Sequence, residues 1–390
     1  MYLKSFTISL IAILVGIASF FVFTVEAQDE PVTAEDYLNQ GIVDYADGEY
    51  DVALIAFTMA VNLDPDLVEA YYHRGNVLID LGEYEAAIAD FDKVIEMDSK
   101  YTYIYFSRGL AYYGLEEYER AIADYSLAIE LDPDESHNYL NRGNVYTDLG
   151  EYQLAIADYE YAIRLNPEYT NAFFNRGGVF QYLGEYDLAL ADYDRAIELN
   201  SEDPNMYFQR ANVYATVGKF ELAIADFDKA IELTPENATL YSNRGNVYAD
   251  MGKIDRAFED FDTAIELDPQ YSFAYYNRGV TLSDLGEDRL ALREFAVAIK
   301  LDPEFPKAYV NRGVTYSRLG EPEKAKSDFD TAIELDSNYA NAYLYRGIVY
   351  LYDYQDCESA RDDFDTFLEL EPDFSQSEAI QDELERLCPA

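Results

Sequence analysis

The stretch Asn243–Pro269, NRGNVYADMGKIDRAFEDFDTAIELDP, recurs along this chain with a period of 34 residues. Asn141 opens NRGNVYTDLGEYQLAIADYEYAIRLNP, and Asn277 opens NRGVTLSDLGEDRLALREFAVAIKLDP. Within each copy, apolar residues recur at the spacing of two successive helices. A fixed period of this length indicates an array of helix–turn–helix repeats, which stack because neither helix alone can bury its apolar stripe. We therefore predict an all-α solenoid rather than several globular domains.

The repeats share the same residue types at fixed positions. With Ala34 as position 1, ten repeats run over residues 34–374, the tenth with one inserted residue. Position 8 is glycine in nine repeats and Ala211 in the sixth, and a small residue there lets two helices approach closely. Position 15 is often a second glycine, such as Gly252, which fits the left-handed turn that ends a helix. The third and tenth repeats lack it, so we expect less regular turns there.

These features resemble the tetratricopeptide repeat family over about 341 of the 390 residues. The family pattern has small residues at positions 8, 20 and 27, an aromatic ring at 24 and proline at 32. The fourth repeat meets it with Gly143, Ala155, Ala162, Tyr159 and Pro167. Two departures are arginine at position 7, where the family has leucine, and the absence of tryptophan, whose place at position 4 is held by tyrosine or phenylalanine. The resemblance implies a right-handed superhelical solenoid whose first helices line a concave, ligand-binding side.

The arginine at position 7 has a candidate partner in the sequence. Nine repeats have arginine there, and the same nine have aspartate or glutamate at position 23, as in Arg74 with Asp90 and Arg244 with Asp260. Antiparallel helices that turn near position 15 bring these positions level. A partly buried arginine needs a carboxylate, because an unpaired buried charge is costly. We predict ion pairs within each repeat; the alternative is a row of ligand-binding arginines.

The N-terminal segment predicts an extracytoplasmic location. Residues 5–25 carry no charge, Lys4 precedes them, and Val25-Glu26-Ala27 is an acceptable cleavage site. The run is long for a signal peptide and long enough to span a bilayer. Residues 1–27 are therefore either a cleaved signal peptide or a retained anchor, and both place the repeats outside the cytoplasm. A short linker over 28–33 leads to the repeats.

The C-terminal residues 375–390 predict a capping helix that covers the apolar face of the last repeat. The chain has two cysteines, Cys357 at the start of the last second helix and Cys388 at the end of the cap. If these helices are antiparallel neighbours, the two cysteines lie side by side, and an extracytoplasmic location permits a disulfide. Two free or buried thiols are the alternative.

The charge balance limits the possible partners. The chain has 76 acidic and 28 basic residues, a net charge of −48. Binding to nucleic acid requires cationic neutralisation of phosphates, so that class is excluded. The acidity either keeps the protein soluble or attracts basic peptides. We find no motif for catalysis, a cofactor or a metal, and the two histidines, His73 and His137, lie two repeats apart.

The remaining candidates lie where the resemblance places the groove. Positions 6 and 9 of the first helices are rich in asparagine, and aromatic residues such as Phe106 and Phe208 recur at position 5. The asparagines are Asn141, Asn144, Asn175, Asn212, Asn243, Asn246, Asn277 and Asn311. Asparagine both donates and accepts hydrogen bonds, so it can hold a peptide backbone of any sequence. The set resembles the asparagine ladder of O-GlcNAc transferases; the alternative is that these residues cap or solvate the helix.

These observations together predict a non-enzymatic, extracytoplasmic scaffold that binds a protein or extended peptide in its groove, with no cofactor. The alternative is a regulatory or assembly subunit of a separate envelope enzyme or export complex. The membrane is involved only through residues 5–25, if they are retained. The sequence does not indicate an oligomeric state.

Overall fold

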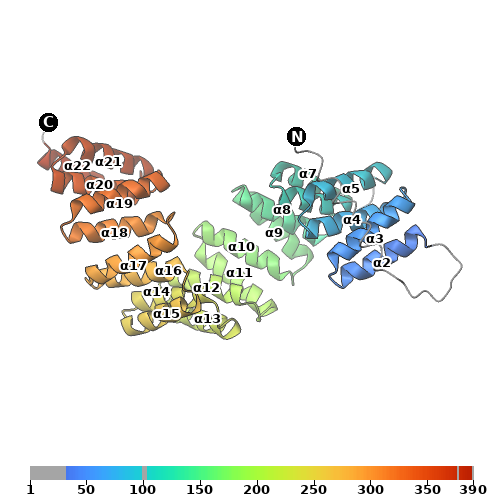
Figure 1. Cartoon of the computed structure of the whole chain (residues 1–390), viewed down its shortest axis with the longest axis horizontal. Coiled ribbons are helices and arrows are strands. Elements are labelled where there is room, and N and C mark those ends of the chain that lie inside the picture. Colours follow the sequence, from blue (N-terminus) through green and yellow to red (C-terminus); the bar gives the residue numbers. More distant parts are fainter. Residues whose placement is uncertain (1–31, 99–102, 376, 389–390) are drawn as a thin grey trace, which may run out of the picture. The chain divides into compact units, whose positions relative to one another are not determined.

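The computed structural model describes residues 32–98, 103–375 and 377–388. These residues form helices joined by short turns, with no strand among them. The chain divides into two compact units, Met1–Leu149 and Gly150–Ala390. Figure 1 labels most of the helices of both units. The predicted segment 1–27, including its apolar run 5–25, and most of the linker 28–33 lie outside the described residues.

The first unit contains seven helices among the described residues. They are α2 (Ala34–Ala46), α3 (Tyr50–Leu63), α4 (Val68–Asp80), α5 (Tyr84–Met97), α6 (Ile104–Gly114), α7 (Tyr118–Leu131) and α8 (Ser136–Asp148). The first of them begins at a capping box. The hydroxyl of Thr33 accepts from the backbone N–H of Asp36, and the carboxylate of Asp36 accepts from the backbone N–H of Thr33.

The second unit continues the same alternation of helices. It contains α9 (Tyr152–Leu165), α10 (Thr170–Tyr182), α11 (Tyr186–Leu199), α12 (Pro204–Thr216), α13 (Phe220–Leu233), α14 (Ala238–Asp250), α15 (Ile254–Leu267), α16 (Ser272–Asp284), α17 (Asp288–Leu301), α18 (Pro306–Arg318), α19 (Pro322–Leu335), α20 (Ala340–Val349), α21 (Cys357–Leu370) and α22 (Ser377–Leu387). Alanine, leucine and glutamate fill the second helices, and all three favour helix. The fold is therefore all-α, as predicted.

Within each unit, the two helices of a repeat pack against each other, and the second helix packs on the first helix of the next repeat. Neighbouring first helices also touch, as α4 and α6 do in the first unit and α14 and α16 in the second. Among the described elements, no two second helices share a contact of that extent. The first helices are thus the more closely spaced layer, and their free face is the inner surface of each unit.

The core is built from one aromatic ring per repeat. The ring at position 24, such as Phe261, is fully buried and lies against the position 8 glycine of the same repeat. A Cβ added to Gly245 would lie 2.7 Å from the ring carbon Cε1 of Phe261. The predicted close approach of the two helices is confirmed, and the ring is what makes a larger residue costly.

The inter-helix turns show how the backbone accommodates missing glycines. Gly252 has φ +71°, and seven other glycines share that left-handed conformation. In the third repeat Glu116 takes it instead, with φ +60°. In the tenth, the π-helical segment η1 (Tyr350–Tyr354) absorbs the inserted residue, and Gln355 makes the left-handed turn with φ +55°. The prediction of irregular turns in these two repeats is confirmed.

The capping helix is α22, which covers the end of the last repeat. Its Leu384 is 4% exposed and packs in one cluster with Ala360 and Phe364 of α21. A disulfide joins Cys357 and Cys388, whose Cα atoms are 5.6 Å apart. In the described part of the chain, no helix has both the length and the apolar character that crossing a membrane requires. The boundaries at 34, 374 and 390 remain predictions.

Candidate functional site

The predicted groove residues lie on the inner face of the first helices, each of them partly buried. Two of the asparagines at position 6 bond to their own helix. Nδ2 of Asn243 donates to the carbonyl oxygen of Thr239 at 2.8 Å, and Nδ2 of Asn141 donates to that of His137 at 2.9 Å. These bonds hold the two carboxamides in a fixed orientation on the helix surface.

Two other asparagines bond to position 5 of the preceding repeat. Nδ2 of Asn277 donates to Oγ of Ser242 at 3.0 Å, and Nδ2 of Asn311 donates to the hydroxyl of Tyr276 at 2.7 Å. In all four cases one N–H of the amide is engaged within the protein, which leaves the carbonyl oxygen Oδ1 and the second N–H for a ligand. These oxygens can accept hydrogen bonds from a peptide backbone. Each amide, however, has one donor fewer than an asparagine without an internal hydrogen bond would offer. The other four predicted residues, Asn144, Asn175, Asn212 and Asn246, lie on the same face, each on its own first helix.

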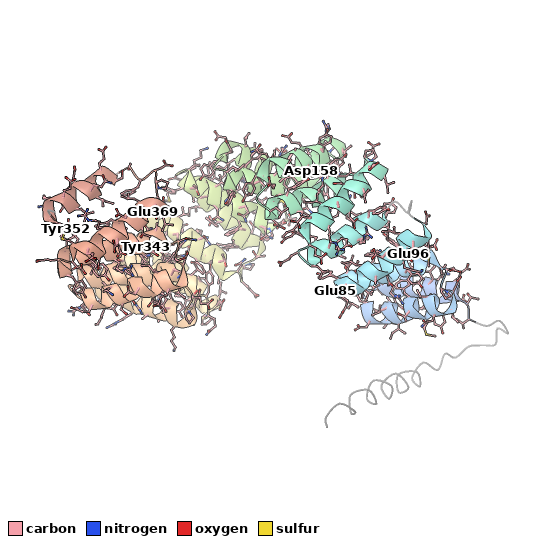
Figure 2. The ribbon with its side chains drawn as sticks, turned by 90° about the horizontal axis from the view of Figure 1, so that it is seen from above. Glu85, Glu96, Asp158, Tyr343, Tyr352 and Glu369 are labelled. Atoms are coloured by element: carbon pink, nitrogen blue, oxygen red, sulfur yellow. A yellow bond between two sulfur atoms is a disulfide. The ribbon has the colours of Figure 1, made fainter. Side chains whose placement is uncertain are left out.

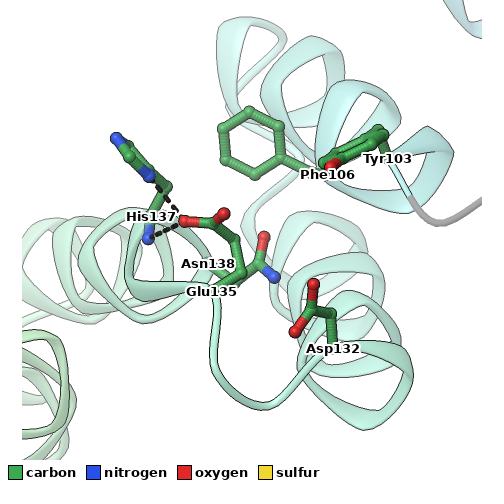
Figure 3. Close-up of a pocket in the computed structure, with 6 residues that line it drawn as sticks. All are labelled: Tyr103, Phe106, Asp132, Glu135, His137 and Asn138. Atoms are coloured by element: carbon green, nitrogen blue, oxygen red, sulfur yellow. Dashed lines mark hydrogen bonds and ion pairs between the residues drawn. The ribbon is translucent and has the colours of Figure 1, made fainter. Parts of the chain in front are cut away.

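The aromatic residues at position 5 line two cavities that occupy equivalent places in the repeat. The larger, of about 230 Å³, lies in the first unit between Phe106 of α6 and the loop that leads into α8. Figure 3 shows its six lining residues. The smaller, of about 110 Å³, lies in the second unit beside Phe208 of α12. Both are lined by positions 2, 5 and 34 of one repeat and by positions 2 and 3 of the next.

The larger cavity carries two carboxylates that sequence reasoning did not single out. Glu135 precedes α8, and its Oε1 accepts from the backbone N–H of His137 at 3.1 Å and contacts Nδ1 of the same residue at 2.6 Å. Burial acts to raise the pKa of Glu135, but the hydrogen bonds from His137 outweigh it and hold the pKa below its ordinary value. Glu135 is therefore an anion throughout the physiological range, with Asp132 as the second carboxylate lining the cavity.

The predicted structural arginines make bidentate contacts to position 23. Nε of Arg244 donates to Asp260 Oδ2 at 2.8 Å, and Nη2 donates to Asp260 Oδ1 at 2.6 Å. Arg74 binds Asp90 in the same way, with both distances at 2.7 Å. The side chains of these arginines are under a fifth exposed and those of the aspartates 8%. The same arrangement recurs in Arg108–Asp124, Arg176–Asp192, Arg210–Asp226, Arg312–Asp328 and Arg346–Asp363.

A second partner of these arginines, on the preceding repeat, was missed by the sequence analysis. Nη1 of Arg244 donates to Oδ1 of Asp228, position 25 of the sixth repeat, at 2.6 Å. Burial alone would lower the pKa of Arg244, but Asp260 and Asp228 together raise it. The equivalent bridges are Arg108–Asp92, Arg210–Asp194, Arg278–Asp262 and Arg346–Asp330. The signal was present, because an acidic residue recurs sixteen positions before most of these arginines.

Tyrosine rings at positions 4 and 11 flank the arginine at position 7. The guanidinium carbon of Arg244 lies 5.5 Å from the ring centroid of Tyr241 at position 4 and 5.8 Å from that of Tyr248 at position 11. Both distances suit a cation–π interaction. The two departures from the family pattern are thus parts of one unit, in which two rings flank an arginine that is held by carboxylates.

The two histidines have separate surroundings. The ring of His73 stacks on Phe57 at 5.6 Å, and burial lowers its pKa. His137 contacts Glu135. Within the residues that the structure describes, no group of three or more His, Cys, Asp or Glu side chains is placed to hold a metal ion.

Comparison with known families agrees with the repeat architecture described above. Models described as TPR repeat match residues 75–116, 143–184, 179–218 and 217–252. Models described as tetratricopeptide repeat match 102–135, 238–271, 306–339 and 261–293. Together they cover more than half of the sequence, so the chain belongs to the tetratricopeptide repeat family. Proteins of this fold are protein–protein interaction scaffolds. No curated protein gives a significant sequence match.

Several solved structures share the fold. Yeast Tom70 has a TM-score of 0.57 and 15% identity over 91% of this chain and 95% of its own. A tetratricopeptide repeat protein from Parabacteroides merdae has a TM-score of 0.53 and 22% identity over 65% of this chain and 98% of its own. Cut9, in the Cut9–Hcn1 hetero-tetramer of APC/C, has a TM-score of 0.51 and 15% identity over 91% and 90%. At these identities the likeness concerns the fold alone.

Proposed function

We propose that this protein is a non-enzymatic, extracytoplasmic scaffold that binds an extended segment of a partner protein along the inner face of its first helices. The main support is the spacing of the site features. Carboxamides fixed by internal hydrogen bonds, as at Asn243 and Asn277, recur from repeat to repeat. Cavities beside Phe106 and Phe208 occupy the same repeat register in the two units. A periodic row of acceptors and cavities suits an extended chain better than a small molecule.

The energetics favour this kind of ligand. The helices that carry the site are held by buried rings and bridged arginines, so the face needs little reordering on binding. A preformed surface loses less conformational entropy when it captures a flexible segment. The ordering cost then falls on the partner, which binds through main-chain N–H groups and side chains that enter the cavities.

An extracytoplasmic location is the second part of the proposal. It is supported by the uncharged run over residues 5–25 and by the Cys357–Cys388 disulfide, since structural disulfides persist mainly in oxidising compartments. Cell fractionation with a C-terminal tag tests it. A tag that stays protected from protease after the outer envelope has been made permeable, as the tag of a cytoplasmic protein would, contradicts the proposal.

Site-directed photo-crosslinking tests the binding face. A photoreactive residue at Val280, on the inner face of α16, is expected to crosslink a partner from the envelope fraction. The same residue at Glu259, on the exposed side of α15, is the matched control. Crosslinks that form only from Glu259 contradict the proposed face. A stoichiometric complex with one enzyme, held through such an outer surface, would favour the regulatory-subunit alternative.

The asparagines are tested with the partner so captured. Asn243→Ala with Asn277→Ala is expected to weaken capture at least fivefold while helical content stays unchanged, because acceptors to the peptide backbone are lost. Asn62→Ala with Asn338→Ala, at two exposed positions off this face, is the matched control. Equal capture by both variants would leave the asparagines with a purely structural role.

A further inference from the structure

The cavity between the third and fourth repeats combines apolar walls with negative charge. Phe106 and Tyr103 form one side, and Asp132 and Glu135 lie on the opposite side, on the loop between α7 and α8 (Figure 3). At about 230 Å³ it is smaller than the roughly 300–1,000 Å³ of sites for whole small-molecule ligands. Its size therefore suits a single long side chain.

A buried polar group lies at the base of the same cavity. Asn138 is 4% exposed, and its carboxamide lies between the carboxylates of Glu135 and Asp132 in Figure 3. Among the described residues, its side chain makes no hydrogen bond. Because it lines the cavity without an internal partner, its carboxamide is open to a ligand group that enters there. Its Oδ1 can accept from an N–H donor, as can both carboxylates.

The ring faces and the carboxylates favour the same chemistry. A guanidinium or ammonium group is attracted to the faces of phenylalanine and tyrosine, and its methylene stem packs on apolar surface. Arginine adds a planar fork that matches a carboxylate. Glu135 remains ionised because His137 donates to it, so the charge that a cation requires is present.

The equivalent cavity of the second unit lacks this charge. There Phe208 corresponds to Phe106, but Asn237 stands in place of Glu135 and Thr239 in place of His137, and no carboxylate lines the cavity. A cavity thus occurs at the same repeat positions in both units, whereas only the cavity beside Phe106 is lined by carboxylates. A role in shaping the fold would not require that difference.

We propose that this cavity binds one arginine or lysine side chain of the partner, with the cation between the ring of Phe106 and the carboxylates of Asp132 and Glu135. The inference rests on the proposed function and adds the chemistry of one residue in the bound segment. The partner's segment is then basic at this position, and the neutral cavity beside Phe208 accepts an uncharged residue.

A titration with blocked amino acids tests the cavity without any partner. The chain has two histidines, so ¹⁵N-histidine labelling of the full chain gives two backbone amide signals. The amide of His137 donates to Glu135 and reports on the cavity, whereas His73 lies outside it. N-acetyl-arginine methylamide and N-acetyl-lysine methylamide are the cationic probes, and the citrulline methylamide is the uncharged isostere of arginine.

The arginine or the lysine probe is expected to shift the His137 signal in a saturable way and to leave His73 in place. The citrulline probe should bind at least tenfold more weakly. Asp132→Asn with Glu135→Gln should weaken the cationic probe at least tenfold, while both keep an acceptor for the local backbone. Asp134→Asn, on the same loop but not lining the cavity, is the control for removal of a nearby charge and should change affinity less than twofold.

Three results would overturn the inference: equal binding of the arginine and citrulline probes, parallel shifts of His137 and His73, or an equal loss in Asp134→Asn. Because no partner is present, these results leave the proposed function standing if partner capture still depends on the inner face. If the probe binds saturably but no partner is captured by the inner face, the proposed function is contradicted and the cation site in the cavity stands.

Discussion

Arg244 illustrates how one side chain joins two neighbouring repeats. Its Nε and Nη2 bind Asp260 of its own repeat, its Nη1 binds Asp228 of the preceding one, and two tyrosine rings flank it. The partner within the repeat was predictable, because arginine at position 7 and acid at position 23 occur together. The bridge to Asp228 of the preceding repeat was not predictable, because an acidic residue that recurs on an exposed helix face is normally there for solvation. Only the packing of successive repeats distinguishes an acid that is merely solvated from one that binds an arginine of the next repeat.

Removing this arginine should be costly. Arg244→Leu is expected to lower the free energy of unfolding by about 3 kcal/mol, since it leaves the buried carboxylate of Asp260 without its counter-ion. Urea denaturation followed by circular dichroism measures it. Arg244→Leu with Asp260→Leu should recover more than half of the loss, because no unpaired charge remains. A double variant as unstable as the single one would show that packing, not charge, dominates.

A substitution at an exposed ion pair checks that burial causes the loss of stability expected for Arg244→Leu. Arg195→Leu breaks an exposed pair with Glu198, whose side chains are 42% and 67% exposed. Pairs of this kind contribute about 0.2–1 kcal/mol. The effect on the urea midpoint should therefore be small, and a loss comparable to that of Arg244→Leu would contradict the explanation.

Glycine to alanine substitutions should have opposite effects at two neighbouring positions of the repeat. Gly245→Ala is expected to destabilise by about 1–3 kcal/mol, because the added Cβ meets the buried ring of Phe261 at 2.7 Å. Gly178→Ala, at position 9, meets its nearest side-chain atom at 3.8 Å and should stabilise its helix by about 0.5–1 kcal/mol. Thermal melting of both variants measures the contrast, and shifts of the same sign would contradict it.

At the scale of elements, the sequence predicted the helix pairs and the irregular turns but not the form those turns take. A missing glycine indicates irregularity without telling which residue accepts a positive φ, and here Glu116 and Gln355 do. The π-helical segment Tyr350–Tyr354 likewise results from the inserted residue only once the packing of α20 on α21 is fixed. The cavity beside Phe106 was missed for a similar reason. Its residues come from two repeats and a loop, and no spacing within one helix links them.

The cap should depend on its disulfide. The Cys357–Cys388 bond closes a loop with a sequence separation of 31 residues. In the chain-entropy model this contributes roughly 3–4 kcal/mol. Reduction is expected to make α22 the first site of limited proteolysis and to lower the melting temperature. Cys357→Ser with Cys388→Ser is the control, since it should behave like the reduced protein and not respond to reductant. A melting temperature unchanged by reduction would refute the dependence.

At the scale of the molecule, acidity and buried tyrosines set the response to pH. Exposed carboxylates such as Glu85 and Glu96 stand on α5 in Figure 2 and carry the solvated negative charge. The tyrosines behave differently, because burial disfavours the phenolate. Burial raises the pKa of Tyr276 to about 12, and it also raises the pKa of Tyr125 and Tyr193.

Alkaline unfolding is the expected consequence. Between pH 10 and about 12 the unfolded chain releases phenolic protons that the native state retains, so stability falls as pH rises through this window. Titration of phenolate absorbance should show exposed tyrosines ionising first and the buried ones together with loss of helix. The chain has no tryptophan, so the absorbance reports tyrosine alone. A single smooth ionisation without loss of helix would contradict this.

The arginine bridges have a mechanical consequence. Under a pulling force, a repeat bound to its predecessor by Arg244 and Asp228 shares the load with it, so neighbouring repeats should yield as blocks. Position 25 of the eighth repeat is Ala296, which offers no acceptor to Arg312 of the ninth. At the junction between α17 and α18, Arg318 instead pairs with Asp288 at 3.1 Å, so the load there should pass through this pair rather than through Arg312.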